Sequence, residues 1–220
     1  MAGQATLTTI TIDANGNAVV NFTYSGGAST DILYLERANS YDPSSKAVVV
    51  RTITRGSITQ LTDHTISNSG AAYWYRIKST NADGSGVVYS PDWMAVTTQC
   101  LDVVTIAPYN AVQTQTKLQV VSSRTGERSR ETQMAEFAGR TRPVVEVGMM
   151  YNQVVNISFY VETAQERYDI ERLLLDNDFW FRDNYGRSFH GTCQKVSSSD
   201  YIGGFNMSAV LTEIDGGVNN

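Results

Sequence analysis

The sequence predicts a mainly β protein, with an N-terminal β-sandwich followed by a second β domain, a β-sandwich or split barrel, that holds one short packed helix. Composition is the first of three observations behind this prediction. Of the 220 residues 41% are hydrophobic and 18% are charged, and Thr, Ser, Val and Tyr are abundant, as they tend to be in β proteins. Short alternating runs separated by turn residues fill the first hundred positions. A helix-start signal stands near residue 163.

The N-terminal half contains seven strand-like runs at roughly ten-residue spacing and no helix signal, which is typical of a β-sandwich. We expect strands at residues 6–12, 18–24, 31–38, 46–53, 57–61, in the run that begins at residues 72–77 and in a last run that ends near residue 98. Asp13, Asn15 and Asn17 are spaced like the start of a calcium loop. The glycine is misplaced and no Glu follows at the twelfth position, so this segment predicts a hairpin turn.

Three segments late in this half carry a family resemblance: residues 61–63 (Leu-Thr-Asp), 72–77 (Ala-Tyr-Trp-Tyr-Arg-Ile) and 81–85 (Asn-Ala-Asp-Gly-Ser). They resemble the late strands of a fibronectin type III domain, in which a Tyr-x-Tyr-Arg-Val strand leads to an Asn-x-x-Gly-x-Ser turn. Ile77 stands where Val is usual. The resemblance covers nearly all of residues 5–98 and implies a fibronectin type III-like β-sandwich, a fold whose modules bind or space other components.

Alternation along residues 73–78 predicts one buried and one outward face. The buried face would carry Tyr73, Tyr75 and Ile77, and the outward face Trp74, Arg76 and Lys78. Tyr73 would take the tyrosine-corner role of the resembled family. An outward Trp74 beside Arg76 is a candidate contact for a partner protein or a sugar. The alternative is that Trp74 only covers the sheet or touches a neighbouring strand.

Residues 97–102 form a short junction without Gly or Pro, and we expect two domains, residues 1–98 and 99–220. Strands are expected after the junction at residues 103–107, 117–122, 134–137, 143–149, 153–161 and 204–213. Residues 123–133 are polar and hold charges of both signs. This span predicts an exposed hairpin or loop that either moves in solvent or becomes ordered against a partner, with Arg124, Arg128 and Arg130 as candidate contacts.

One helix and one hairpin are predicted together near the C-terminus. Thr163 and Glu166 fit a capping box, and a helix of about three turns should follow. Because such a helix is short, it needs a sheet to pack on. The aromatic run at residues 178–182 predicts a strand, and the turn residues 183–186 predict a hairpin in which Gly186 takes the positive φ.

This half resembles a second family. Residues 137–144 (Phe-Ala-Gly-Arg-Thr-Arg-Pro-Val), a strand, the helix at Thr163, the hairpin at residues 179–187 and a closing strand ending near Glu213 follow one another in this order. In that order they resemble the distal tail and tail-tip proteins of siphophages, which are minor tail proteins. The match covers about residues 100–215. It implies a β-sandwich or split barrel with one packed helix, used to build a ring.

Several functional expectations follow from the second resemblance. The chain would be a structural, ring-forming distal tail or tail-tip component of a bacteriophage virion, linking the tail tube to the tip or baseplate. Its partners would be copies of itself and the tube, hub and tape-measure proteins, and DNA would only pass through. The alternative function is a virion module that binds a host-surface glycan or protein through Trp74, Trp93 and neighbouring tyrosines.

The sequence gives no support for an enzyme, a cofactor or a metal site. His64 and His190 stand in no metalloprotease, zinc-finger or triad context, and no phosphate loop, nucleophile elbow or dinucleotide motif occurs. Cys100 and Cys193 match no metal or redox spacing, and we expect two small buried side chains in place of a disulfide. The net charge of −5 argues against a nucleic-acid-binding face.

The expected site of synthesis is the host cytoplasm. The first residues show no basic region followed by an apolar core, and no apolar run of 18 residues occurs. The sequence therefore predicts neither a secretory signal nor a membrane anchor.

Overall fold

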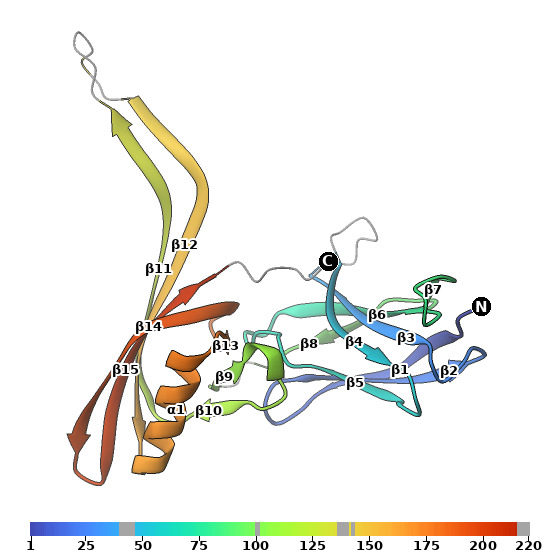
Figure 1. Cartoon of the computed structure of the whole chain (residues 1–220), viewed down its shortest axis with the longest axis horizontal. Coiled ribbons are helices and arrows are strands. Elements are labelled where there is room, and N and C mark those ends of the chain that lie inside the picture. Colours follow the sequence, from blue (N-terminus) through green and yellow to red (C-terminus); the bar gives the residue numbers. More distant parts are fainter. Residues whose placement is uncertain (40–46, 100–101, 136–140, 142–143, 215–220) are drawn as a thin grey trace. The chain divides into compact units, whose positions relative to one another are not determined.

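The computed structural model describes residues 1–39, 47–99, 102–135, 141 and 144–214. It divides into two units (Figure 1). Unit 1 comprises Met1–Val103 together with Arg182–Ser188, and unit 2 comprises Val104–Phe181 and Phe189–Asn220. The chain therefore leaves unit 2 for seven residues and then returns to it.

Unit 1 is a β-sandwich of two antiparallel sheets. The first sheet has the order β1-β2-β5, with β1 Gln4–Ile12, β2 Ala18–Ser25 and β5 Gln60–Asp63. The second has the order β4-β3-β6-β7, with β4 Val48–Thr54, β3 Ile32–Ala38, β6 Ala72–Thr80 and β7 Val88–Tyr89, and β8 Met94–Thr97 also pairs with β6. Alternating apolar residues of both sheets form one core, because period-two side chains from each strand point inward. Its members include Val20, Phe22, Leu61, Leu33, Leu35, Tyr75 and Ile77.

Unit 2 is built on one seven-stranded sheet with the order β10-β9-β13-β14-β15-β12-β11. The strands are β9 Val104–Pro108, β10 Thr116–Leu118, β11 Val121–Ala135, β12 Val144–Val161, β13 Phe179–Arg182, β14 Ser188–Tyr201 and β15 Gly204–Glu213. A 3-10 turn, η1, covers Tyr109–Ala111. The helix α1 Ala164–Asp176 packs Ile170 and Leu174 into the sheet's apolar core. A mainly β fold with one short packed helix, as the sequence predicts, is confirmed.

The predicted helix start is confirmed in detail. Glu166 N donates to Thr163 Oγ1 at 3.1 Å, and Thr163 N donates to Glu166 Oε2 at 3.2 Å. These two bonds satisfy backbone donors that the first helical turn leaves unpaired. The hairpin after the helix is confirmed as well, and Gly186 has a φ of +88°. Asp183 Oδ1 accepts from the backbone amides of Tyr185 and Arg187, which fixes the turn.

Several strand boundaries differ from expectation. The expected strand at residues 117–122 is interrupted by Val120, whose φ of +47° ends β10 and starts β11. The two expected strands at 143–149 and 153–161 form the single strand β12. The charged span, residues 123–133, was expected to be a hairpin or a loop. It lies within β11 and pairs with β12, so it forms one strand of a hairpin. Residues 136–140 and 142–143, which include most of the Gly-Arg-x-x-Pro segment of the second resemblance, lie outside the described residues.

Candidate interaction surfaces

The outward face of β6 carries the first candidate contacts. Register places Trp74 opposite Ala38, Arg76 opposite Glu36 and Lys78 opposite Tyr34, so all three side chains share one face of the sheet, as expected. Trp74 is half-buried. Tyr73, on the other face, packs against the core but is only partly buried, and its hydroxyl lies 2.9 Å from Ser67 Oγ.

Arg76 is held in place from three sides. Its Nε donates to Glu36 Oε2 at 2.6 Å, and Glu36 is 7% exposed. Its guanidinium carbon lies 4.3 Å from the ring centre of Tyr89 and 4.5 Å from that of Trp93. A guanidinium stacked on aromatic faces and paired with a nearly buried carboxylate has little remaining freedom. The group therefore presents a rigid surface of one cation and two rings, of which sequence reasoning identified Arg76 and Trp93.

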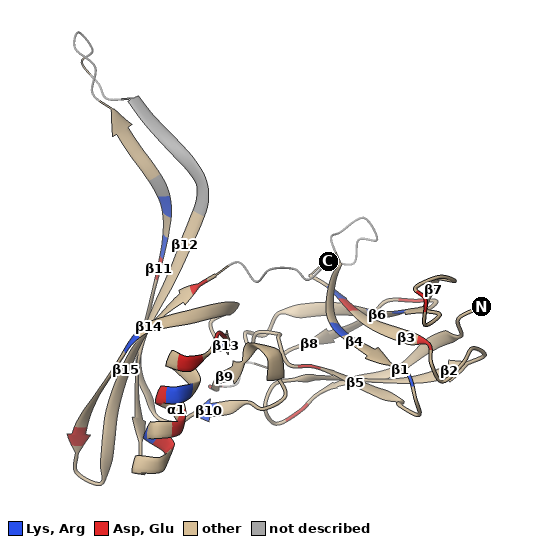
Figure 2. Ribbon diagram, in the orientation of Figure 1, with Lys and Arg blue, Asp and Glu red and all other residues tan. Residues whose placement is uncertain are grey.

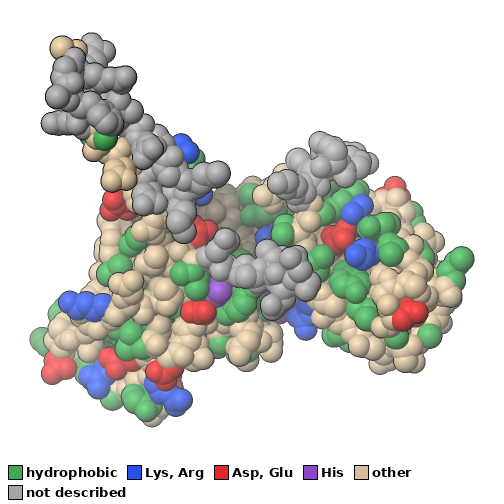
Figure 3. All heavy atoms as spheres, turned by 45° about the horizontal axis from the view of Figure 1, so that its top comes forward, with side chains coloured by type: hydrophobic (Ala, Val, Ile, Leu, Met, Phe, Trp, Pro, Cys, Tyr) green, Lys and Arg blue, Asp and Glu red, His purple; other side chains and the backbone are tan. Residues whose placement is uncertain are grey.

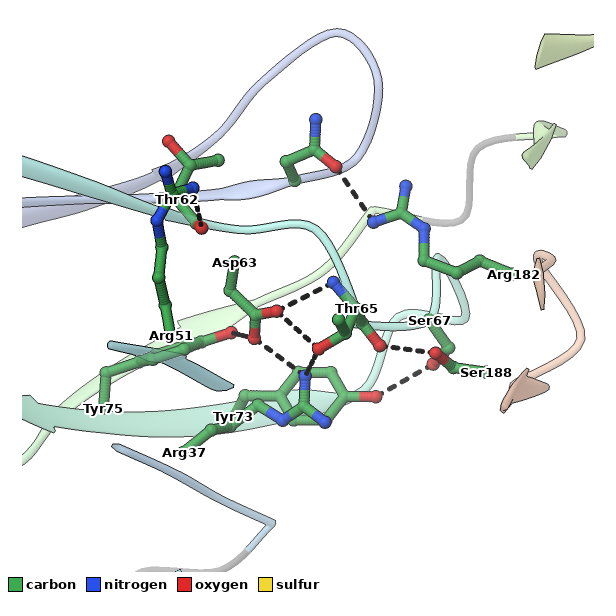
Figure 4. Close-up of polar contacts among 11 residues, drawn as sticks. Arg37, Arg51, Thr62, Asp63, Thr65, Ser67, Tyr73, Tyr75, Arg182 and Ser188 are labelled. Carbon is green, nitrogen blue, oxygen red and sulfur yellow. Dashed lines mark hydrogen bonds and ion pairs between the residues drawn. The ribbon is translucent and has the colours of Figure 1, made fainter. Parts of the chain in front are cut away.

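A buried polar network in unit 1 surrounds Asp63 (Figure 4). Asp63 is 1% exposed, and Arg37 Nη1 donates to its Oδ2 at 2.7 Å. The hydroxyl of Tyr75 donates to the same oxygen at 2.9 Å, while the backbone amide and hydroxyl of Thr65 donate to Oδ1 at 2.7 and 2.6 Å. Burial alone would raise the pKa of Asp63, but the Arg37 charge and these hydrogen bonds outweigh it and lower the pKa. The carboxylate is thus ionised and fully paired.

The turn Arg182–Ser188 extends this network. Arg182 is 1% exposed; its Nη1 donates to Asn17 Oδ1 at 3.0 Å and its Nη2 to the carbonyl of Asn15 at 2.9 Å. Desolvation lowers the pKa of Arg182 to about 10. Ser188 Oγ donates to the Thr65 carbonyl (Figure 4), and Asn68 N donates to the carbonyl of Asp183 at 3.1 Å. Sequence reasoning missed this group, because an Arg at a hairpin end gives no sign that it is buried.

The second set of candidate contacts lies on β11. Outside the core, β11 and the first part of β12 continue as a two-stranded ribbon, because β15 pairs with β12 only from Val154 onward. Figure 1 shows this ribbon extending past the rest of unit 2. Cross-strand register places Arg124 opposite Ile157, Arg128 opposite Gln153 and Arg130 opposite Tyr151. Directly opposite residues of antiparallel strands point to the same side of the sheet.

The three arginines therefore share one side of β11. Arg128 and Arg130 lie on the ribbon, whereas Arg124 lies within the seven-stranded sheet, opposite Ile157, which is 1% exposed and belongs to the apolar core. We call this side the arginine face. Glu127 pairs with Val154 on the opposite side. Arg128 and Arg130 are exposed, and the Arg130 guanidinium lies 5.2 Å from the ring centre of Tyr151, which is itself 65% exposed. Lys and Arg appear as two bands on β11 in Figure 2.

A cavity of about 230 Å³ lies in unit 2 where the first turns of α1 meet the far end of β12. Its walls are Thr116, Lys117, Gln119, Val120, Tyr160, Val161, Glu162, Glu166, Asp169 and Ile170. Three carboxylates against one lysine make the lining acidic. Figure 3 shows acidic and basic side chains gathered at the end of unit 2 away from the ribbon.

His190 and Cys193 belong to residue types that often serve in catalysis or metal binding. His190 is 8% exposed, stacks on Tyr109 with ring centres 3.7 Å apart, and lies 3.6 Å from Asp178. Cys193 is a buried free thiol in the core of unit 2, whereas Cys100 lies outside the described residues. Among the residues that the structure describes, no three His, Cys, Asp or Glu side chains are grouped to hold a metal ion. None of the described helices has the length and apolarity that a membrane crossing requires.

Comparison with known proteins gives a weak structural likeness. No protein-family profile matches the sequence, and no curated protein matches it. Among solved structures, a chain from the tail of an empty gene transfer agent particle, refined with C6 symmetry, is 7% identical with a TM-score of 0.39. A chain from the virion of a native gene transfer agent particle is also 7% identical, with a TM-score of 0.37. Each covers 51% of this chain and 91% of its own length.

Proposed function

We propose that this chain is a structural component of a phage-like tail that assembles into a ring through unit 2, as a distal tail or tail-tip protein between the tail tube and the tip or baseplate. The observation that carries the proposal is the ribbon of β11 and β12. Two strands without a packed layer are marginally stable in water. Tyr151 and Met134 are 65% and 69% exposed on it. A neighbour that covers the ribbon would bury these side chains.

Two observations favour a role in assembly over a role in catalysis. The order of strand, capped helix, hairpin and closing strand is the order of the resembled tail proteins, and the helix and hairpin lie where the sequence predicts them. In addition, Asp63 and Arg182, two titratable groups with shifted pKa values, are engaged in structural hydrogen bonds within unit 1. Perturbed groups in a catalytic site would instead converge on a substrate-sized cleft.

Unit 1 is proposed to be a fibronectin type III-like module displayed by the ring. The arrangement of its strands supports this assignment. A three-stranded sheet, β1-β2-β5, packs on a second sheet that contains β4, β3 and β6, as expected from the resemblance of the sequence to fibronectin type III domains. In the assembled particle the partners would be further copies of this chain and the tube, hub and tape-measure proteins. The chain's excess of acidic residues would keep passing DNA from adhering, because like charges repel.

The test removes the ribbon and keeps the sheet. Ser129 and Asn152 are paired in register, so a two-residue Asn-Gly turn can join them in place of residues 130–151. The shortened chain should keep the melting temperature of the full chain, because the core lies outside the deleted part. It should fail to form rings in electron micrographs and in mass photometry. Rings that persist without the ribbon would contradict the proposal.

A second candidate function, glycan binding by unit 1, is favoured by the rigid group around Arg76. Tyr89 is 43% exposed, and exposed aromatic rings beside a fixed cation are suited to stacking on a sugar. A glycan array with the full chain and with Trp93→Ala tests it. Binding that depends on Trp93 would support this function, and absence of any glycan signal would remove it.

A further inference from the structure

We propose that the acidic cavity beside α1 is the acceptor site for the arginine face of a neighbouring copy's ribbon. This inference rests on the proposed ring assembly and names the two surfaces that would meet in it. The occupant of the cavity is a second copy of this chain.

Charge supports the pairing of these two surfaces. The cavity presents Glu162, Glu166 and Asp169 against Lys117. On the ribbon, the arginine face presents Arg128 and Arg130, while the strand's Glu127 points to the other side. A guanidinium can make two parallel hydrogen bonds to a carboxylate, so Arg on one surface and carboxylates on the other form a specific pair.

The size and lining of the cavity suit side chains. Drug-sized ligands occupy pockets of roughly 300–1,000 Å³, and the cavity, at about 230 Å³, is smaller. Tyr160 and Ile170 give it an apolar wall for the stem or the plane of an arginine, beside carboxylates for its charge. One or two arginine side chains from the ribbon match these features.

One residue that lines the cavity has a strained backbone conformation. Val120 lines the cavity, is 69% exposed, and holds a φ of +47°. A β-branched residue in this region is a true outlier, and such residues persist where a site over-determines them. An exposed apolar side chain held in strain at the mouth of a cavity is explained if an incoming ribbon covers it.

Distance excludes the chain's own ribbon as the occupant. Arg130 pairs with Tyr151, and Tyr160 of the cavity lies nine residues further along the same strand. At about 3.3 Å per residue this separation is roughly 30 Å. The residues that line the cavity belong to the first turns of α1 and the last residues of β12, whereas the ribbon is at the other end of β12. Figure 1 shows α1 beside the end of β12 that lies away from the ribbon, so only another copy can bring the two surfaces together. Donor and acceptor on different surfaces define a heterologous contact, which closes into a ring when the rotation allows.

Charge reversal tests the contact. Arg128→Glu with Arg130→Glu, and separately Glu162→Arg with Asp169→Arg, should each raise the concentration needed for half-assembly more than roughly tenfold, because like charges then face one another. The chain that carries all four changes should assemble again. Glu166 is left in place because it caps α1. Glu127→Arg, on the opposite side of the ribbon, and Asp200→Arg, on β14, are matched controls that should assemble like the original chain.

A second measurement does not depend on stability. A photocrosslinking residue in place of Arg128 should join to a peptide from residues 160–170 of another copy, identified by mass spectrometry. If the original chain forms rings but both reversals assemble normally, or if the crosslink lands elsewhere, the acceptor site is wrong and ring assembly stands. If the original chain stays monomeric at every concentration and in tails, both the acceptor site and the proposed function fall.

Discussion

Replacing Asp63 by Asn is the perturbation for which the structure gives the largest expected loss of stability. The amide keeps the shape of the carboxylate but has one acceptor oxygen. In one orientation its NH₂ group faces the donors of Arg37 and Tyr75, and in the other it faces both donors of Thr65. The hydroxyls of Tyr75 and Thr65 can turn to accept, but the Arg37 guanidinium and the Thr65 amide cannot, so either orientation sets donor against donor at one of these two groups. In both orientations Arg37 loses its counterion.

Removing one partner of a buried ion pair costs about 3–5 kcal/mol. For a domain of about 100 residues each kcal/mol lowers the melting temperature by roughly 4–8 °C, so Asp63→Asn should lower that of unit 1 by at least about 12 °C. Tyr75→Phe removes one donor and leaves the Arg37 pair intact. Its cost should be nearer 1 kcal/mol, the value of an ordinary hydrogen bond.

The pH dependence gives an independent check by calorimetry of the full chain. Because folding lowers the pKa of Asp63, its contribution to stability is present above the unfolded value near 3.9 and is lost as pH falls through the lower folded value. The melting temperature of Asp63→Asn should therefore fall less steeply below pH 4 than that of the original chain. A loss under about 1 kcal/mol at pH 7, with an unchanged acid profile, would refute the reasoning.

Three further changes have defined outcomes. Val120→Gly should leave the monomer's melting temperature unchanged or higher, since Gly relieves a strain of roughly 1–3 kcal/mol, and should weaken ring assembly in mass photometry; a destabilised monomer would contradict the strain. Gly186→Val should cost about 1–3 kcal/mol, because Val would have to adopt a φ of +88°, and an unchanged denaturant midpoint would exclude that conformation. Burial lowers the pKa of His190, so stability should decline as pH falls below about 6.5, and His190→Phe, which can still stack on Tyr109, should remove that decline in calorimetry.

Local signals in the sequence were sufficient for much of the fold. The capping box at Thr163 and the turn at Gly186 were predictable because each depends on residues within one turn of the backbone. The alternation around Arg76 likewise placed its side chain on the outward face of the sheet. Its pairing with Glu36 was not predictable, because the two residues are forty positions apart and meet only through strand register.

Several features of the candidate sites could not be predicted from the sequence. Charges on β11 were visible, but the separation of Arg128 from Glu127 onto opposite sides follows only once the span is known to be a strand. The buried Arg182 and the positive φ of Val120 have no sequence signature, since Arg favours exposed positions and Val disfavours positive φ. These exceptions to local rules are positions where tertiary contacts prevail, and such positions are expected at sites of function or strain.

The central claim is that unit 2 builds a ring through its ribbon. Electron microscopy of the purified full chain beside the chain shortened between Ser129 and Asn152 tests it most directly. We expect closed rings of the full chain and monomers of the shortened chain, with equal melting temperatures. Full chain that remains monomeric, alone and in tail preparations, would contradict it.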